Sequence, residues 1–240
     1  MPVASIDNPT DYEFWAWGVG NPVSGPMFDT YGALGGIATD DSELAQARRV
    51  TRQTDGVRRA LASLVGHGIS SRATYPTGDA FPEQLAALAE MLEVGLPIRC
   101  VAITGAGGYD THAGQAATLA SNIQTTADSL VDFQQDIEAR GIADRVHIHV
   151  WSEFGRRVAE NGGGTDHGAA GAAFLIGTNV QRQVVGEFPG LASLDSRGNL
   201  LHTSDFRVIY TGLLDQWLGA DPGPIIPGAD NMVVPALLAA

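Results

Sequence analysis

The chain has 240 residues, of which 44% are hydrophobic, and its 27 acidic and 14 basic side chains give a formal net charge of −13 at pH 7. These values indicate a folded globular protein and exclude a nucleic-acid partner, because an acidic surface repels phosphate backbones. Every basic residue is an arginine, which excludes Schiff-base lysine chemistry and a Walker-type phosphate loop.

The first part of the chain, residues 1–39, is rich in glycine, proline and aromatic residues and is predicted to be loop rather than helix. Its aromatic residues Phe14, Trp15 and Trp17 form either a satellite core or an uncovered apolar patch. No signal-peptide pattern and no apolar run of membrane-spanning length is found, so no membrane partner is expected and the localisation is left open.

The remainder, residues 40–240, is predicted to form one α/β metal-binding domain. Apolar residues at helical spacing predict helices over the ranges 40–64, 82–93, 115–139 and 204–219. Asp41 and its neighbours are typical capping residues for the first of these helices, and Ser204 is the predicted cap of the last.

Three short apolar runs predict buried strands over 98–104, 145–151 and 172–178. Because a long helix separates the first two runs, we expect a βαβ unit and therefore a mostly parallel sheet flanked by helices. Cys100 lies in the first run and is predicted to be a buried structural thiol. His147 and His149 alternate along the second run, which favours packed histidines or a polar sheet face.

Polar side chains follow the first two of these predicted strands and precede the third. They are Asp110, Thr111, His112, Ser152, Glu153, Asp166 and His167. Parallel strands end at one edge of a sheet, so these side chains are expected to converge there. Carboxylate oxygens together with imidazole nitrogens suit Zn²⁺, Mn²⁺ or a similar divalent cation. The sequence therefore predicts a metal site at this edge.

The three carboxylates among these residues also have simpler interpretations. Asp110 is suited to capping the helix that follows it, and Asp166, between glycines, is suited to a turn. Glu153 is able to form an ion pair with Arg156 or Arg157, and such surface pairs contribute little.

Three segments carry a resemblance to a known family. They are GGYDTHAGQ, VWSEFGRRVAENGGGTDHG and TSDFRVIYTGLLDQWLG. Together they resemble the bacterial DUF1501 family, which is similar to the alkaline phosphatase and sulfatase superfamily. By that superfamily's pattern, Asp110 and His112 resemble a first metal motif, Glu153 a second, and His167-Gly168 a third. The chain departs from the pattern at Glu153-Phe154, where superfamily members usually carry Asp-His.

The resemblance covers roughly residues 12–230 and is to the C-terminal part of longer proteins that are usually exported. It implies a truncated alkaline-phosphatase-like domain without the N-terminal half, which supplies the superfamily's nucleophile. Such a domain has an open sheet edge, so we expect a homo-oligomer.

The resemblance implies a promiscuous metal-dependent hydrolase of phosphate mono-, di- or triesters or of sulfate esters. Asp110, His112 and His167 would hold one divalent metal, Zn²⁺ first and Mn²⁺, Mg²⁺ or Ca²⁺ as alternatives. Glu153, with Asp166, would hold a second ion or act as general base. A metal-bound water would attack a small anionic ester held by Arg156 or Arg157.

Other interpretations of the same residues stay open. Thr111, Ser152 and Thr165 are alternative nucleophiles. The chain is alternatively a non-catalytic metal-binding remnant or interaction module of a longer protein. A further alternative is a glycosidase that uses Asp110 and Glu153 as its carboxylate pair.

Overall fold

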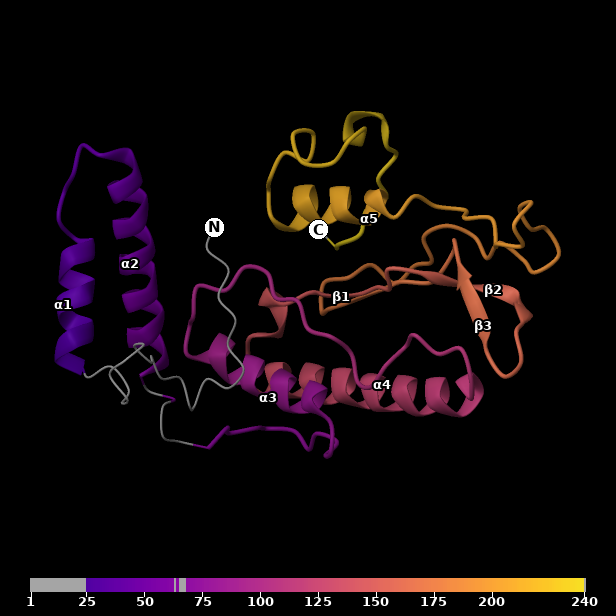
Figure 1. The fold of residues 1–240 in the computed structure, drawn as a ribbon, viewed down its shortest axis with the longest axis horizontal. Coiled ribbons are helices and arrows are strands. Elements are labelled where there is room, and N and C mark those ends of the chain that lie inside the picture. The colour runs from indigo at the N-terminus through magenta and orange to yellow at the C-terminus, as the bar shows by residue number, and fades with distance from the viewer. Residues whose placement is uncertain (1–24, 63, 65–67, 240) are drawn as a thin grey trace. The chain divides into compact units, whose positions relative to one another are not determined.

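The structure, a computed structural model, describes residues 25–62, 64 and 68–239 (Figure 1). Phe14, Trp15 and Trp17 lie outside the described residues, so their predicted role stays a prediction. The described residues divide into two compact units. Unit 1 takes residues up to Gly107 together with Thr125–Ile142, and unit 2 takes Gly108–Gln124 together with the residues from Ala143 onward.

The three long helices predicted from apolar periodicity are confirmed. They are α2 (Ser42–Leu61), α3 (Ala80–Glu93) and α4 (Gln115–Ala139). The Asp41 carboxylate caps α2 by accepting the Leu44 amide at 2.8 Å. The α4 helix is followed by Gly141 at a φ of 71°, and the Ile142 amide reaches back to the Ile137 carbonyl at 3.0 Å. This left-handed turn favours glycine and stops the helix.

Helix α1 (Gly25–Gly35) corrects the prediction that residues 1–39 are loop. Pro26 lies in its first turn, where a missing N–H is tolerated. Gly32 and Gly35 face α2: a Cβ at Gly32 would be 2.6 Å from Asp55 Oδ2, and one at Gly35 would be 3.1 Å from the Arg48 carbonyl oxygen. Arg58 of α2 donates to Asp29 at 2.9 Å, so the α1–α2 hairpin crosses the predicted boundary after residue 39 (Figure 1). Glycines that indicated a loop in the sequence therefore allow close helix packing.

The core of unit 1 lies around α3 and the C-terminal part of α4. Its fully or largely buried apolar side chains include Leu61, Phe81, Leu85, Ala89, Phe133 and Ile137. Two charged side chains, Asp136 and Arg140, are fully buried with them. They pair with each other, since Arg140 Nε donates to Asp136 at 2.6 Å. The Asp136 carboxylate also accepts from the Ser71 hydroxyl and the Tyr75 hydroxyl, each at 3.2 Å. These hydrogen bonds hold residues 71–75, which precede α3, against α4.

The described strands all lie in unit 2 and form two antiparallel pairs. Strand β1 (Ile148–Val150) pairs with β4 (Phe174–Ile176). Strand β2 (Gly155–Glu160) and β3 (Thr165–Gly168) form a hairpin whose register shifts between Arg156 and Glu160.

The predicted mostly parallel sheet, and with it the truncated alkaline-phosphatase-like fold, is wrong for the described residues. Residues 98–104 form no strand, so the predicted βαβ unit lacks its first member. The run 172–178 does contain β4, but the connection from β1 to β4 carries the β2–β3 hairpin instead of a crossover helix. Without a crossover helix the returning strand runs antiparallel. Cys100 is exposed and not the predicted buried thiol.

The helix predicted near the C-terminus is present as α5 (Arg207–Gly212), which continues in a π-helical turn, η3 (Leu213–Trp217). Its predicted cap is wrong: Asp205 Oδ1, and not Ser204, accepts the Arg207 amide, at 2.9 Å. Single 3₁₀ turns cover η2 (Ala143–Arg145) and η4 (Ala229–Asn231). No helix among the described residues is long and apolar enough to cross a bilayer.

Candidate metal centre

Two segments of unit 2 bring the candidate ligands together. The first is the loop before α4, which carries Asp110 and His112 and ends at Gly114 with a φ of 59°. The second is the β2–β3 hairpin, which carries His167 on β3. The Gln115 amide donates to the Gly163 carbonyl at 2.9 Å, so the first turn of α4 is tied to the hairpin tip.

The glycine run 162–164 lets the hairpin tip approach this loop. Gly162 and Gly163 adopt φ values of 96° and 115°, which L side chains rarely adopt. A Cβ at Gly164 would lie 2.6 Å from the carbonyl carbon of His112. The tip therefore lies directly against the backbone of a candidate ligand, and this contact requires a residue without a side chain.

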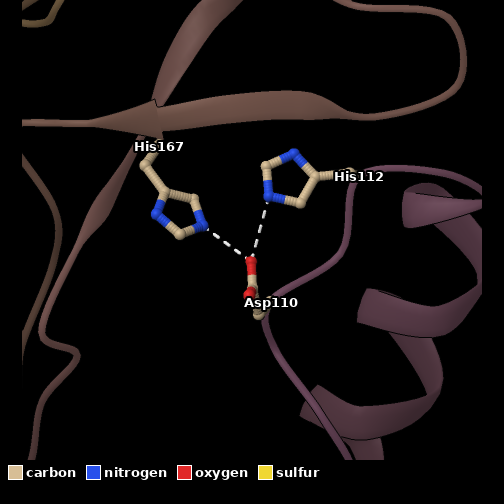
Figure 2. Close-up of side chains that lie close together, drawn as sticks. All are labelled: Asp110, His112 and His167. Carbon is tan, nitrogen blue, oxygen red and sulfur yellow. Dashed lines mark hydrogen bonds and ion pairs between the residues drawn. The ribbon is translucent and has the colours of Figure 1, made fainter.

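The Asp110 carboxylate lies between the two imidazoles (Figure 2). Its Oδ1 is 2.6 Å from His167 Nε2 and 3.1 Å from His112 Nε2. One ligand atom from each residue lies within 4.8 Å of the other two, so the three side chains form a group that is able to hold one cation. All three are exposed, which leaves the group open to solvent and to a small molecule.

The electrostatics favour an ionised Asp110. The hydrogen bond with His167 is the main reason that the pKa of the Asp110 carboxyl lies below its ordinary value; desolvation opposes it, and smaller contributions from the two imidazoles add to the lowering. A carboxylate must be ionised, and an imidazole neutral, to bind a metal. The donor set of two imidazole nitrogens and one carboxylate oxygen is the set found in catalytic zinc sites with an open fourth position.

Asp166 lies beside this group rather than within it. Its Oδ1 is 3.8 Å from His112 Nδ1, the ring nitrogen that does not face Asp110. Asn161 donates to the same oxygen at 2.7 Å, and Arg157 Nη1 is 4.0 Å from the other carboxylate oxygen. Asp166 therefore lies near the free nitrogen of His112 without a hydrogen bond to it.

The His167 ring stacks with two other rings. The Phe154 ring lies nearly parallel to it, at an interplanar angle of 6° and a centroid distance of 3.9 Å. The His112 ring lies at a centroid distance of 5.1 Å from His167. Arg156 in turn lies over Phe154, with its guanidinium carbon 5.1 Å from the ring centroid.

The structure does not bring the remaining predicted residues into the group. Glu153 is exposed and, in the described part of the chain, forms no ion pair with an arginine and is not among the three clustered ligands. The Ser152 hydroxyl donates to the Phe154 carbonyl at 2.9 Å. The Thr111 hydroxyl oxygen is buried and has no hydrogen-bond partner among the described residues. Asp110 has the two histidines as its partners, and the predicted capping of α4 is not seen.

Sequence reasoning missed the residues that support the ligands. In the sequence Phe154 is only a departure from the superfamily pattern, and no motif marks Asn161 or Gln115. Gln115 Oε1 accepts from the Thr165 hydroxyl at 3.1 Å, two residues before His167 on β3. The signal that the sequence offers is that Phe154 lies in the same segment, SEFGRRVAENGGGTDHG, as His167.

Comparison with known proteins gives one result. Residues 29–211 match the model of a family described as a protein of unknown function, DUF1501, and this range is more than half of the chain. No curated protein and no solved structure matches the chain.

Proposed function

The chain belongs to the DUF1501 family, and for this member we propose a metal-dependent hydrolase of phosphate or sulfate esters centred on Asp110, His112 and His167. The observation that carries the proposal is the convergence of these three ligand atoms within 4.8 Å. His167 lies 57 residues from Asp110 in the sequence, so chain proximity does not explain the group.

A further part of the proposal is the relationship of the family to the alkaline phosphatase and sulfatase superfamily. The superfamily's first and third metal motifs correspond to Asp110 with His112 and to His167, which are the residues that cluster. Its second motif corresponds to Glu153, which lies outside the cluster. The proposal therefore commits to one metal held by three side chains. Zn²⁺ fits this donor set first, and Mn²⁺ second.

A divalent cation bound there would polarise the ester oxygen and lower the pKa of coordinated water to about 7. The protein's own groups complete the site. Asp166 lies 3.8 Å from His112 Nδ1, so a small movement of its side chain would let it hold that ring as outer carboxylates hold metal ligands. Glu153 is an exposed carboxylate without a partner in the described residues, and we assign it the general-base role.

Arg157 is the guanidinium best placed for the anionic oxygens of the substrate. Its side chain is 39% exposed, its nearest carboxylate is 4.0 Å away, and its Nε is buried without a hydrogen-bond partner in the described residues. A guanidinium binds phosphate or sulfate oxygens as a two-pronged donor. Attack by water is favoured over a protein nucleophile, because the Thr111 oxygen is buried and the Ser152 hydroxyl already donates to a carbonyl.

Self-association is also part of the proposal. Unit 2 exposes large apolar side chains, among them Val233 at 91%, Val184 at 89% and Phe188 at 78%. Apolar surface of this kind favours contact with another copy of the chain. Light scattering that shows a monomer at all concentrations would contradict this part.

The central experiment is metal analysis of untagged protein, followed by assays on p-nitrophenyl phosphate, bis(p-nitrophenyl) phosphate and p-nitrophenyl sulfate. We expect bound zinc or manganese and turnover that a chelator abolishes. His167→Ala should lose both metal and turnover, whereas His202→Ala, at an exposed histidine outside the cluster, should keep both. Metal without turnover would support a non-catalytic remnant. Turnover that the chelator does not change would instead support the alternative of a glycosidase that uses a carboxylate pair.

A further inference from the structure

We infer that Arg156 is a positioning residue of the metal centre. Its side chain holds the Asp110 loop against the β2–β3 hairpin, so that the metal ligands of the two segments meet. The inference rests on the proposed metal site. It differs from the expectation that Arg156 holds the substrate, a role that the structure leaves to Arg157.

The guanidinium of Arg156 joins the two ligand-bearing segments directly. Its Nη2 donates to the Tyr109 carbonyl at 2.6 Å, and its Nη1 donates to the Thr165 carbonyl at 2.6 Å. Tyr109 directly precedes Asp110, and Thr165 lies two residues before His167. A single planar group therefore fixes the spacing of the two backbones next to their ligands.

The same side chain also supports the plane of the His167 ring. Arg156 lies over one face of Phe154, and Phe154 stacks on His167 at 3.9 Å. Stacking restricts rotation of the imidazole about its side-chain bonds, and the ring then presents Nε2 to Asp110 at 2.6 Å. Arg156 thus sets both the distance between the segments and the direction of one ligand.

Arginine suits this role better than lysine does. A guanidinium carries several N–H donors in one rigid plane, so it is able to bond two carbonyls and stack on a ring at once. An ammonium is a compact charge that stacks less well and offers no fixed fork. Each terminal nitrogen of Arg156 already donates one N–H to a carbonyl, so a substrate anion would have only the remaining N–H groups of this guanidinium to bind.

The test uses the full chain with Arg156→Ala and Arg156→Lys, and with Arg182→Ala as a matched control. Arg182 is an exposed arginine of the same unit whose side chain forms no hydrogen bond or ion pair in the described residues. Co²⁺ affinity is measured by competition with a coloured chelator, and circular dichroism checks the fold. We expect both Arg156 variants to bind Co²⁺ about 10–100-fold more weakly, the range seen when outer partners of metal ligands are lost.

Two further readouts separate positioning from general loss of structure. Guanidinium ion at non-denaturing millimolar concentration should restore Co²⁺ binding to Arg156→Ala but not to His167→Ala. In metal-free protein, stacking on Phe154 should displace the NMR signals of the His167 ring protons, and the Arg156 variants should lose that displacement while Arg182→Ala keeps it. Unchanged Co²⁺ affinity together with unchanged His167 signals in the Arg156 variants would overturn the inference. If the unaltered chain binds no metal, the proposed function fails, and the His167 signals still decide whether Arg156 positions the ring.

Discussion

Replacing Gly164 by alanine tests the close contact between the hairpin tip and the Asp110 loop. The added Cβ would lie 2.6 Å from the His112 carbonyl carbon and 2.7 Å from its oxygen, whereas ordinary contact begins near 3.4 Å. The backbone must therefore move by about 0.8 Å, the difference between 3.4 and 2.6 Å. Insertion of this kind into a tight contact typically costs about 1–3 kcal/mol. Because the obstacle is backbone, rotation of a side chain does not relieve it.

We expect this displacement to separate His112 from His167 and to weaken Zn²⁺ binding at least about tenfold, since about 1.4 kcal/mol corresponds to a factor of ten. Gly108→Ala is the matched control, because Gly108 lies in the same loop and a Cβ there meets nothing within 4 Å. Affinity is measured by chelator competition and stability by urea unfolding. Zn²⁺ affinity in Gly164→Ala equal to that of Gly108→Ala would refute the argument that the tip contact sets the ligand geometry.

Two predictions concern the stability of each unit. Asp136→Asn should lower the free energy of unfolding of unit 1 by about 1–3 kcal/mol, because the buried Arg140 loses one carboxylate partner and keeps Glu93 as the other. Urea unfolding followed by circular dichroism measures this, and an unchanged free energy of unfolding would contradict it. His147 contacts Trp217 and His149 contacts Tyr210, and burial lowers the pKa of both histidines. As the pH falls below about 6.5, the unfolded chain binds protons at these imidazoles before the folded chain does. The stabilising contribution of the two histidines is therefore complete above about pH 6.5 and is lost as the pH falls. The urea midpoint of unit 2 should therefore drop between pH 7.5 and 5, and less so in the double variant His147→Phe, His149→Phe; an equal drop in both proteins would count against the two histidines.

The helices of this protein could be predicted because their signals are local. Apolar spacing and the Asp41 cap determined α2, and Gly141 determined the end of α4. The α1 helix was missed because Gly32 and Gly35 resemble loop residues, and their use becomes clear only beside α2. The same residue type indicates either a turn or a close helix contact, and the neighbouring element decides which.

For the candidate site, the residue types and their glycine-rich surroundings followed from the sequence alone. The sequence presented Asp110, His112 and His167 as metal-ligand residues, because carboxylates and imidazoles after apolar runs suit that chemistry. It did not separate them from Glu153, which has equally suitable chemistry but lies outside the three-residue group. Nor did it distinguish Arg156 from Arg157, which are adjacent in sequence.

Only the tertiary structure decided the strand polarity, the membership of the site and the roles of its supporting residues. Strand polarity depends on which distant strands pair, and β1 pairs with β4 across a connection that holds a hairpin, so the parallel sheet expected from strand order did not form. The site depends on contacts across 57 residues, such as that between Asp110 and His167, and on a guanidinium that bonds two separate carbonyls. Local sequence specifies which groups a residue offers, whereas long-range packing specifies which other groups it meets.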